Sequence, residues 1–217
     1  MVSSLSVVFI LVTLLLCFAV PIGFLLLLLK GRRGVFGFWL AGALGFFVPQ
    51  LLIRIPILQF AGNLPGFVLF QQTRPFAFAM MLALTAGLFE TAGRLLVLRI
   101  ALVRRLSYTT GLAAGAGHGG IEAMALIGLT YVNNLVISLM INAGQLEQLV
   151  PDPAMAASIR RQLIETPSHL FLVAGAERIF TMVFHIAMSL LLTLFIIRKR
   201  AFIGALLVFG LDRKSVV

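Results

Sequence analysis

Residues 5–29 read LSVVFILVTLLLCFAVPIGFLLLLL, an apolar run without a charged side chain. A helix needs about 20 apolar residues to cross the hydrocarbon core of a bilayer. The run has no basic residue before it, is too long for a signal-peptide core, and is followed by Lys30, Arg32 and Arg33 instead of a small-residue cleavage site. We interpret it as a retained membrane-spanning helix whose N-terminus lies outside.

The whole chain has the composition of a membrane protein. Of its 217 residues, 61% are hydrophobic and only 11% are charged, and the mean hydropathy is +1.11. These values exclude a soluble domain with a polar surface. A single cysteine, Cys17, excludes an internal disulfide and a thiolate metal cluster. We expect an all-α, polytopic transmembrane helical bundle that forms one integral membrane domain over residues 1–217.

Further apolar stretches predict the other spans, giving five clear helices. The four that follow the first cover residues 35–53, 76–98, 108–129 and 170–197. Residues 132–143 either continue the fourth span or form a re-entrant piece. Two longer connections, 54–75 and 132–167, would lie on one side, and residues 153–166 (PAMAASIRRQLIET) predict a short helix, at the membrane interface or in a solvated loop.

The formal net charge of +10 comes from residues beside the spans. They cluster after the first, third and fifth spans and not along an amphipathic face, which indicates membrane topology and not nucleic-acid binding. The clusters are Lys30, Arg32 and Arg33, then Arg99, Arg104 and Arg105, then Arg198, Lys199 and Arg200. We expect these loops to be cytoplasmic in the plasma (inner) membrane of a prokaryote.

The C-terminal region predicts an interrupted sixth span. Residues 201–211 are apolar but too short to cross a bilayer. Residues 212–217, DRKSVV, match what a common sequencing adapter encodes in one frame. We therefore expect the terminal residues to be an assembly artefact and the natural protein to continue for one or more helices.

Ionisable side chains inside the spans point to function. Each costs roughly 2.5–3.5 kcal/mol to insert, so such residues are kept where they face a bundle interior and act on ions, protons or substrates. The residues concerned are Glu90, His118, Glu122, Glu177 and His185. A membrane-embedded catalytic or ion-handling site is the leading hypothesis.

Three spacings organise these residues, because side chains four apart share a helix face. Glu90 and Arg94 either belong to a site or form a structural ion pair, with Arg94 reaching the interface. His118 and Glu122, in the segment GHGGIEA (117–123), could bind one ion or water, or make an incidental hydrogen bond in a packing helix whose glycines, with Gly111 and Gly115, allow close approach.

The fifth span carries a polar stripe of Glu177, Thr181, His185 and Ser189. Glu177 with the neighbouring Arg178 is either part of the site or a pair that orients the helix near the outer surface. From a rise of about 1.5 Å per residue, Glu90 lies ~14 Å and both His118 and His185 ~20 Å from the basic loops. We expect these three to share one layer, with Glu122 as a further member.

The three motifs, ExxxR at 90–94, GHGGxEA at 117–123, and ER followed by a histidine at 177–185, resemble the YhfC family of membrane peptidases. That family is similar to the CAAX-protease and bacteriocin-processing intramembrane enzymes, whose pattern is EExxxR, FxxxH and HxxxN on separate helices. The resemblance covers residues 30–200. Phe89, Ala114 and Ser189 depart from the related pattern, which puts oxyanion stabilisation in question.

The resemblance and the residues together imply hydrolysis of a membrane protein or membrane peptide by activated water. Glu90 would be the general base, and Arg94 would keep it ionised or orient it. His118 and His185 would ligate zinc or another divalent metal, or donate hydrogen bonds to an oxyanion without metal. Glu122 would be a third metal ligand or an orienting group for a histidine.

Two other classes of function remain open at this point. The same groups would relay protons or bind a cation in a transporter or channel, although the sequence has no visible inverted repeat. A noncatalytic membrane scaffold is the third reading, since the fold also resembles a scaffold subunit of gamma-secretase and a fold does not determine catalysis. The expected partners are the lipid bilayer and a membrane substrate, and the sequence does not indicate an oligomeric state.

Overall fold

The computed structural model describes residues 1–30 and 34–212, and the regular elements within these ranges are all helical. Five of the described helices are long and apolar enough to cross a membrane. They are Ser4–Leu29, Val35–Ala61, Pro75–Ile100, Tyr108–Ala143 and Ser168–Ile197. The predicted polytopic helical bundle is therefore confirmed. The expectations for Arg32, Arg33 and residues 213–217 fall outside the described ranges.

Most of the long helices consist of consecutive segments, some of them π-helical. In chain order the segments are α1 (Ser4–Leu29), α2 (Val35–Phe46), the π-helix η1 (Phe47–Arg54), α3 (Ile55–Ala61), α5 (Pro75–Leu96), the π-helix η2 (Val97–Ala101), α6 (Tyr108–Glu122), the π-helix η4 (Ala123–Gly128), α7 (Leu129–Ala143) and α10 (Ser168–Ile197). The shorter elements are α4 (Pro65–Thr73), the 3-10 turn η3 (Val103–Arg105), α8 (Leu146–Leu149), α9 (Pro153–Glu165) and α11 (Ala201–Leu211).

The second long helix continues past residue 53, where the sequence predicted its end. Arg54 was assigned to a connection, but it lies inside the helix because its guanidinium finds partners on α5. It donates to the carbonyl oxygen of Leu82 at 2.8 Å and to the hydroxyl of Thr85 at 3.2 Å. An arginine whose charge is bonded in this way does not have to end an apolar helix. The predicted connection 54–75 thus contains the rest of this helix and α4.

The fourth long helix runs past residue 129, which is one of the two alternatives that the sequence left open. It continues through η4 and α7 to Ala143, so residues 132–143 are a continuation and not a re-entrant piece. Gly144 then ends the helix in the left-handed conformation, with φ of 70°. Glycine adopts this conformation at helix C-termini without the steric cost that a Cβ would bring.

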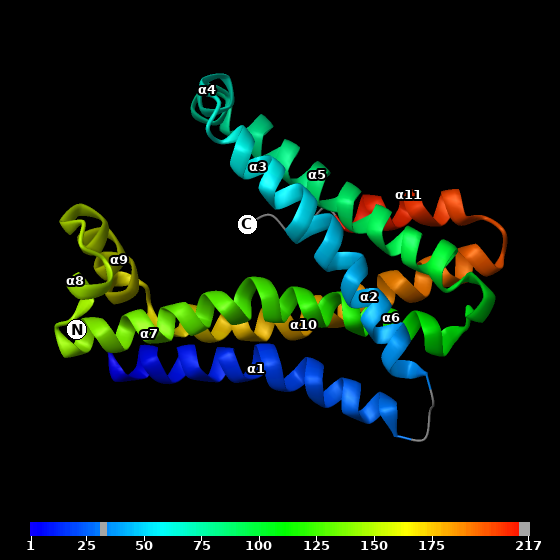
Figure 1. Ribbon diagram of the computed structural model, residues 1–217, viewed down its shortest axis with the longest axis horizontal. Coiled ribbons are helices and arrows are strands. Elements are labelled where there is room, and N and C mark those ends of the chain that lie inside the picture. Colours follow the sequence, from blue (N-terminus) through cyan, green and yellow to red (C-terminus); the bar gives the residue numbers. More distant parts are fainter. Residues whose placement is uncertain (31–33, 213–217) are drawn as a thin grey trace.

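The helices form two arms that meet at α6 (Figure 1). One arm contains α2, α3 and α5, and the other contains α1, α7 and α10, while α6 packs against α1, α2 and α10. The C-terminal ends of α1, α5 and α10 lie at one end of the molecule (Figure 1). This placement agrees with the alternation that the basic loops predicted.

Glycines on α6 allow its close contacts with two neighbours. A Cβ built on Gly117 would collide with the carbonyl oxygen of Trp39 on α2. A Cβ on Gly115 would lie 2.7 Å from the Cα of Ile186 on α10. Small residues let membrane helices approach backbone to backbone, which is the role expected from the sequence.

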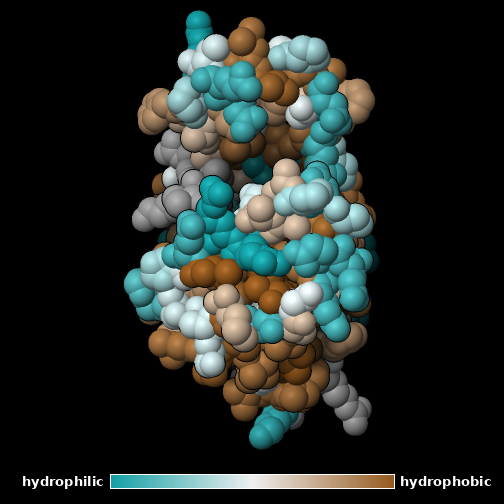
Figure 2. All heavy atoms as spheres, turned by 90° about the vertical axis from the view of Figure 1, so that its left-hand side faces the viewer, coloured by the Kyte–Doolittle hydropathy of each residue, from teal (hydrophilic) through white to brown (hydrophobic). Residues whose placement is uncertain are grey.

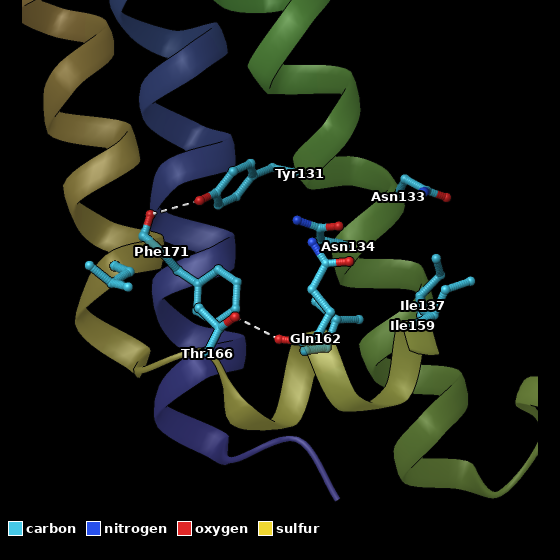
Figure 3. A pocket seen from close by; sticks show the side chains of 10 residues that line it. Tyr131, Asn133, Asn134, Ile137, Ile159, Gln162, Thr166 and Phe171 are labelled. Carbon is cyan, nitrogen blue, oxygen red and sulfur yellow. Dashed lines mark hydrogen bonds between the residues drawn. The ribbon is translucent and has the colours of Figure 1, made fainter. Parts of the chain in front are cut away.

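A polar segment covers the opposite end of the bundle. The predicted helix 153–166 is present as α9, and the Asp152 carboxylate caps it by accepting a hydrogen bond from the Ala154 amide at 2.9 Å. Hydrophilic side chains gather across the middle of this end, at the height of α8 and α9 (Figure 2). A cavity of about 370 Å³ lies between α7, α9 and α10, with Tyr131, Gln162 and Phe171 on its walls (Figure 3).

Candidate functional site

Glu90, His118 and His185 meet in the interior, one from each of α5, α6 and α10. Each residue is at most 4% exposed. One possible ligand atom from each lies within 4.8 Å of the others. The residues that the sequence placed in one layer therefore do lie together, and the group is compatible with a bound metal ion.

Several polar atoms of this group have no partner of their own. Both ring nitrogens of His118 and the Oε2 atom of Glu90 are buried without a hydrogen bond in the described part of the chain. The Phe46 ring contacts His118 in an edge-to-face arrangement, with ring centroids 5.2 Å apart. A buried polar atom without a partner costs about 1–3 kcal/mol. The arrangement is therefore suited to an ion or a polar ligand that would satisfy these atoms.

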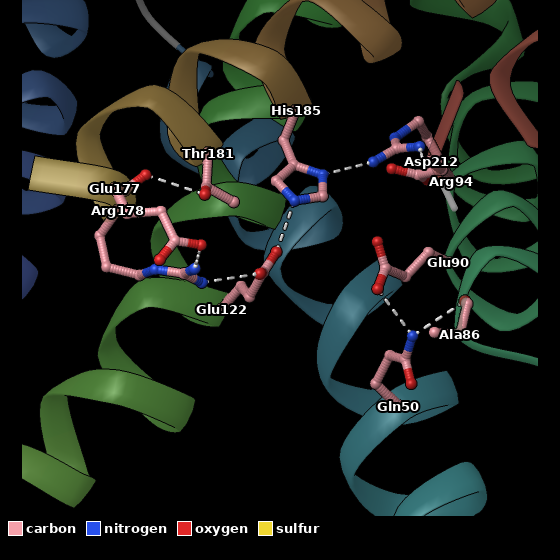
Figure 4. Close-up of polar contacts among 10 residues, drawn as sticks. All are labelled: Gln50, Ala86, Glu90, Arg94, Glu122, Glu177, Arg178, Thr181, His185 and Asp212. Carbon is pink, nitrogen blue, oxygen red and sulfur yellow. Dashed lines mark hydrogen bonds and ion pairs between the residues drawn. The ribbon is translucent and has the colours of Figure 1, made fainter. Parts of the chain in front are cut away.

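His185 is held from both sides of its ring (Figure 4). Its Nε2 atom lies 2.5 Å from Oε2 of Glu122, and its Nδ1 atom lies 2.7 Å from a guanidinium nitrogen of Arg94. A guanidinium has only donors, so Nδ1 accepts and Nε2 carries the hydrogen that faces the carboxylate. The two contacts fix both the ring orientation and the tautomer of His185.

Arg94 does not form the ion pair with Glu90 that its spacing allowed. Within residues 1–30 and 34–212, its partners are His185 and the Asp212 carboxylate, which it contacts at 2.8 Å. The guanidinium is 2% exposed, so it does not reach toward the interface. Arg94 is thus connected to the buried centre by its contact with His185 on α10, and not by an ion pair with Glu90 on its own helix.

The polar stripe on α10 runs from the surface to this centre. Glu177 is 62% exposed, whereas His185 is 2% exposed. Arg178 lies between them and donates to Glu177 at 2.6 Å and to Oε1 of Glu122 at 3.2 Å (Figure 4). The Glu177 and Arg178 pair, which the sequence left as either an orienting pair or part of the site, is therefore connected to the site by Glu122.

The sequence analysis missed Gln50, which is buried on η1 beside Glu90. Its Nε2 atom donates to Oε1 of Glu90 at 2.8 Å and to the carbonyl oxygen of Ala86 at 3.0 Å (Figure 4). A glutamine amide inside an apolar span was the available signal. It was not singled out because an amide carries no charge and its insertion cost is smaller than that of the carboxylates.

Comparison with known proteins identifies similar membrane proteins. A family model described as YhfC intramembrane metalloprotease matches residues 16–211. The "Uncharacterized membrane protein YhfC" of Bacillus subtilis (strain 168) is 32% identical over 203 residues, which cover 92% of this chain and 78% of that protein. No solved structure matches the chain.

Proposed function

Because this chain belongs to the YhfC intramembrane metalloprotease family, we propose that it is a membrane-embedded metallopeptidase acting on a membrane protein or membrane peptide. The observation that carries the proposal is the buried group of Glu90, His118 and His185, whose possible ligand atoms lie within 4.8 Å of one another. Two imidazoles and a carboxylate, brought together from three helices, can serve a hydrolytic metal site, with the imidazoles as ligands and the carboxylate as general base.

The donor set fits a divalent metal ion such as zinc. His118 offers two ring nitrogens that have no partner within the described residues, and His185 offers Nδ1 if the Arg94 guanidinium turns away from it. These two histidines would hold the ion, with Glu90 beside them. When bound, a divalent metal polarises a peptide carbonyl and makes water a stronger nucleophile at neutral pH.

Glu90 is the proton acceptor in this proposal. Its Oε1 atom accepts a hydrogen bond from Gln50, and its Oε2 atom is buried and has no partner among residues 1–30 and 34–212. Oε2 would take a proton from water as the water oxygen attacks the carbonyl carbon of the scissile bond. Glu90 would then give this proton to the amide nitrogen as the carbon–nitrogen bond breaks, which leaves the carboxylate ready for the next cycle.

Glu122 acts as the orienting group for His185 in this proposal. Of the two roles that the sequence left open, the contacts of Glu122 favour this one, because its two oxygens face His185 and Arg178. A histidine that ligates a metal commonly donates its other N–H to a carboxylate, which fixes the ring and raises its basicity.

Replacing Glu122 by glutamine should therefore weaken the site without removing it. Loss of such an orienting carboxylate lowers metal affinity or activity by about 10- to 100-fold. Zinc affinity, measured by competition with a chromophoric chelator, should fall in this range for Glu122→Gln. An unchanged zinc affinity would contradict the orienting role.

Metal content and cleavage test the proposed function together. Purified protein in liposomes should contain zinc or another divalent metal, as measured by elemental mass spectrometry. It should also cleave a transmembrane peptide. His118→Ala combined with His185→Ala should lose both properties. His169→Ala is the matched control, since His169 is exposed at the start of α10 and should keep both. Metal and cleavage retained in the double variant would overturn the assignment.

We also place the protein in a prokaryotic plasma membrane with its basic end in the cytoplasm. The C-terminal ends of α1, α5 and α10 lie at the same end of the molecule, and cytoplasmic loops carry an excess of Lys and Arg, which supports this orientation. In this orientation the polar segment α8–α9 lies on the outer side. A cysteine introduced at the exposed Gln162 of α9 should then be labelled by a membrane-impermeant reagent in intact cells.

A further inference from the structure

Gln50 lies in a part of the second helix whose backbone departs from regular α-helical geometry. The segment Phe47–Arg54 is π-helical, and Gln50 is 3% exposed within it. Pro49 precedes it and packs against α5, where a Cβ on Gly93 would lie 2.7 Å from the Pro49 ring. Short π-helical segments recur at functional sites because the wider turn redirects a side chain. Here η1 brings the Gln50 amide to the turn of α5 that carries Glu90.

The contacts of Gln50 determine which way its amide points. The carbonyl oxygen of Ala86 can only accept, and it lies 3.0 Å from Nε2 of Gln50. The guanidinium of Arg54 can only donate, and it lies 3.2 Å from Oε1 of Gln50. Both partners require the same orientation. Nε2 therefore faces Glu90 as a donor, 2.8 Å from Oε1 of its carboxylate.

Arg54 is in turn held by α5, as its bonds to Leu82 and Thr85 show. Hydrogen bonds therefore connect Glu90 to Gln50, and Gln50 to Arg54. A carboxyl group is free to rotate about its terminal torsion unless a partner fixes it. With Oε1 bound to Gln50, the oxygen left for chemistry is Oε2, which has no partner within the described ranges.

We propose that Gln50, braced by Arg54, is a positioning residue that holds Oε1 of the Glu90 carboxylate, so that Oε2 remains available to accept a proton from water. This inference rests on the role of Glu90 in the proposed function. Gln50 does not touch the reacting atoms, so it acts on the rate through the orientation of the general base. Partners that orient the ligands of metal sites typically contribute about 10- to 100-fold in metal affinity or activity, and we expect an effect of this size for Gln50.

Gln50→Leu tests the proposal, since leucine has a similar size but cannot donate to Glu90. In liposomes, kcat for a transmembrane peptide should fall about 10- to 100-fold while KM stays unchanged, because substrate binding does not involve this amide. Gln59→Leu, the same change at an exposed position on α3, should behave as wild type. An unchanged kcat in Gln50→Leu, or an equal loss in Gln59→Leu, would overturn the proposal.

Arg54→Met provides a second variant that leaves Gln50 in place. It should lower kcat less than Gln50→Leu does, and it should add nothing to Gln50→Leu in the double variant, because both changes act along one line of contacts. Additive losses in the double variant would contradict a shared route to Glu90.

A spectroscopic readout separates this inference from the proposed function. The protein is labelled with carbon-13 glutamate and its infrared spectrum is compared with that of Glu90→Gln. The carboxylate band that is missing in Glu90→Gln is assigned to Glu90. This band should shift in Gln50→Leu and stay in place in Gln59→Leu, whether or not a peptide is cleaved. Absence of cleavage by the wild type would overturn the proposed function, whereas an unshifted band would overturn the positioning role of Gln50.

Discussion

Replacing Glu90 by glutamine should abolish peptide cleavage and leave the helical bundle intact. Glutamine has the same shape, and its carbonyl oxygen can still accept the hydrogen bond that Gln50 donates to Oε1. The change removes the proton acceptor at Oε2. Loss of a general base lowers a rate by about 10²- to 10⁴-fold. The rate of cleavage of a transmembrane peptide in liposomes measures the effect.

The matched control for this change is Glu165→Gln. Glu165 lies on α9, its side chain is 71% exposed, and its nearest cation is Arg161 at 4.0 Å. An exposed pair at this distance contributes little to stability. The control should retain full cleavage and the same circular dichroism spectrum as wild type. Wild-type cleavage by Glu90→Gln would remove Glu90 from the mechanism.

Gly117→Ala should destabilise the whole bundle, because the added methyl group has no space. Its Cβ would collide with the carbonyl oxygen of Trp39, which belongs to the backbone of α2 and cannot turn away as a side chain would. Overpacking typically costs about 1–3 kcal/mol, and a contact between two backbones is at the upper end or above it. Thermal unfolding of the solubilised protein, followed by circular dichroism, should show a clear loss of stability.

Gly37→Ala provides the comparison on α2. A Cβ at Gly37 meets no atom of the described residues within 4 Å, so alanine fits there and favours the helix by about 0.5–1 kcal/mol relative to glycine. We expect this variant to be as stable as wild type or slightly more stable. Equal stability of the Gly117 and Gly37 variants would show that α2 and α6 are not packed as closely as described.

The sequence predicted the class of fold because the length of each apolar stretch can be read directly from the chain. It placed the starts of the long helices well, but it ended the second helix too early and left open whether the fourth continues through residues 132–143. In the second, the charge of Arg54 suggested a surface, whereas its partners on α5 keep it within the helix. In the fourth, helical structure continues to Ala143. Such tertiary contacts cannot be seen in a local pattern of hydropathy.

The convergence of three candidate site residues was also predictable from the sequence. Spacing of four residues and estimated depth brought Glu90, His118 and His185 to one layer, and the structure brings their donor atoms within 4.8 Å. The sequence could not show that Arg94 would contact His185 instead of Glu90, because that choice depends on how α5 and α10 pack. It also could not show that a π-helical turn would direct Gln50 toward Glu90.

The most direct test of a hydrolytic centre is the fate of the attacking water. Wild-type protein in liposomes should be incubated with a transmembrane peptide in water enriched in oxygen-18, and the products analysed by mass spectrometry. We predict two fragments from one cleavage, with the heavy oxygen in the new carboxyl group, and no fragments from Glu90→Gln. The account would be contradicted if metal-loaded wild-type protein left the peptide intact. It would also be contradicted if Glu90→Gln gave the same yield of fragments as wild type.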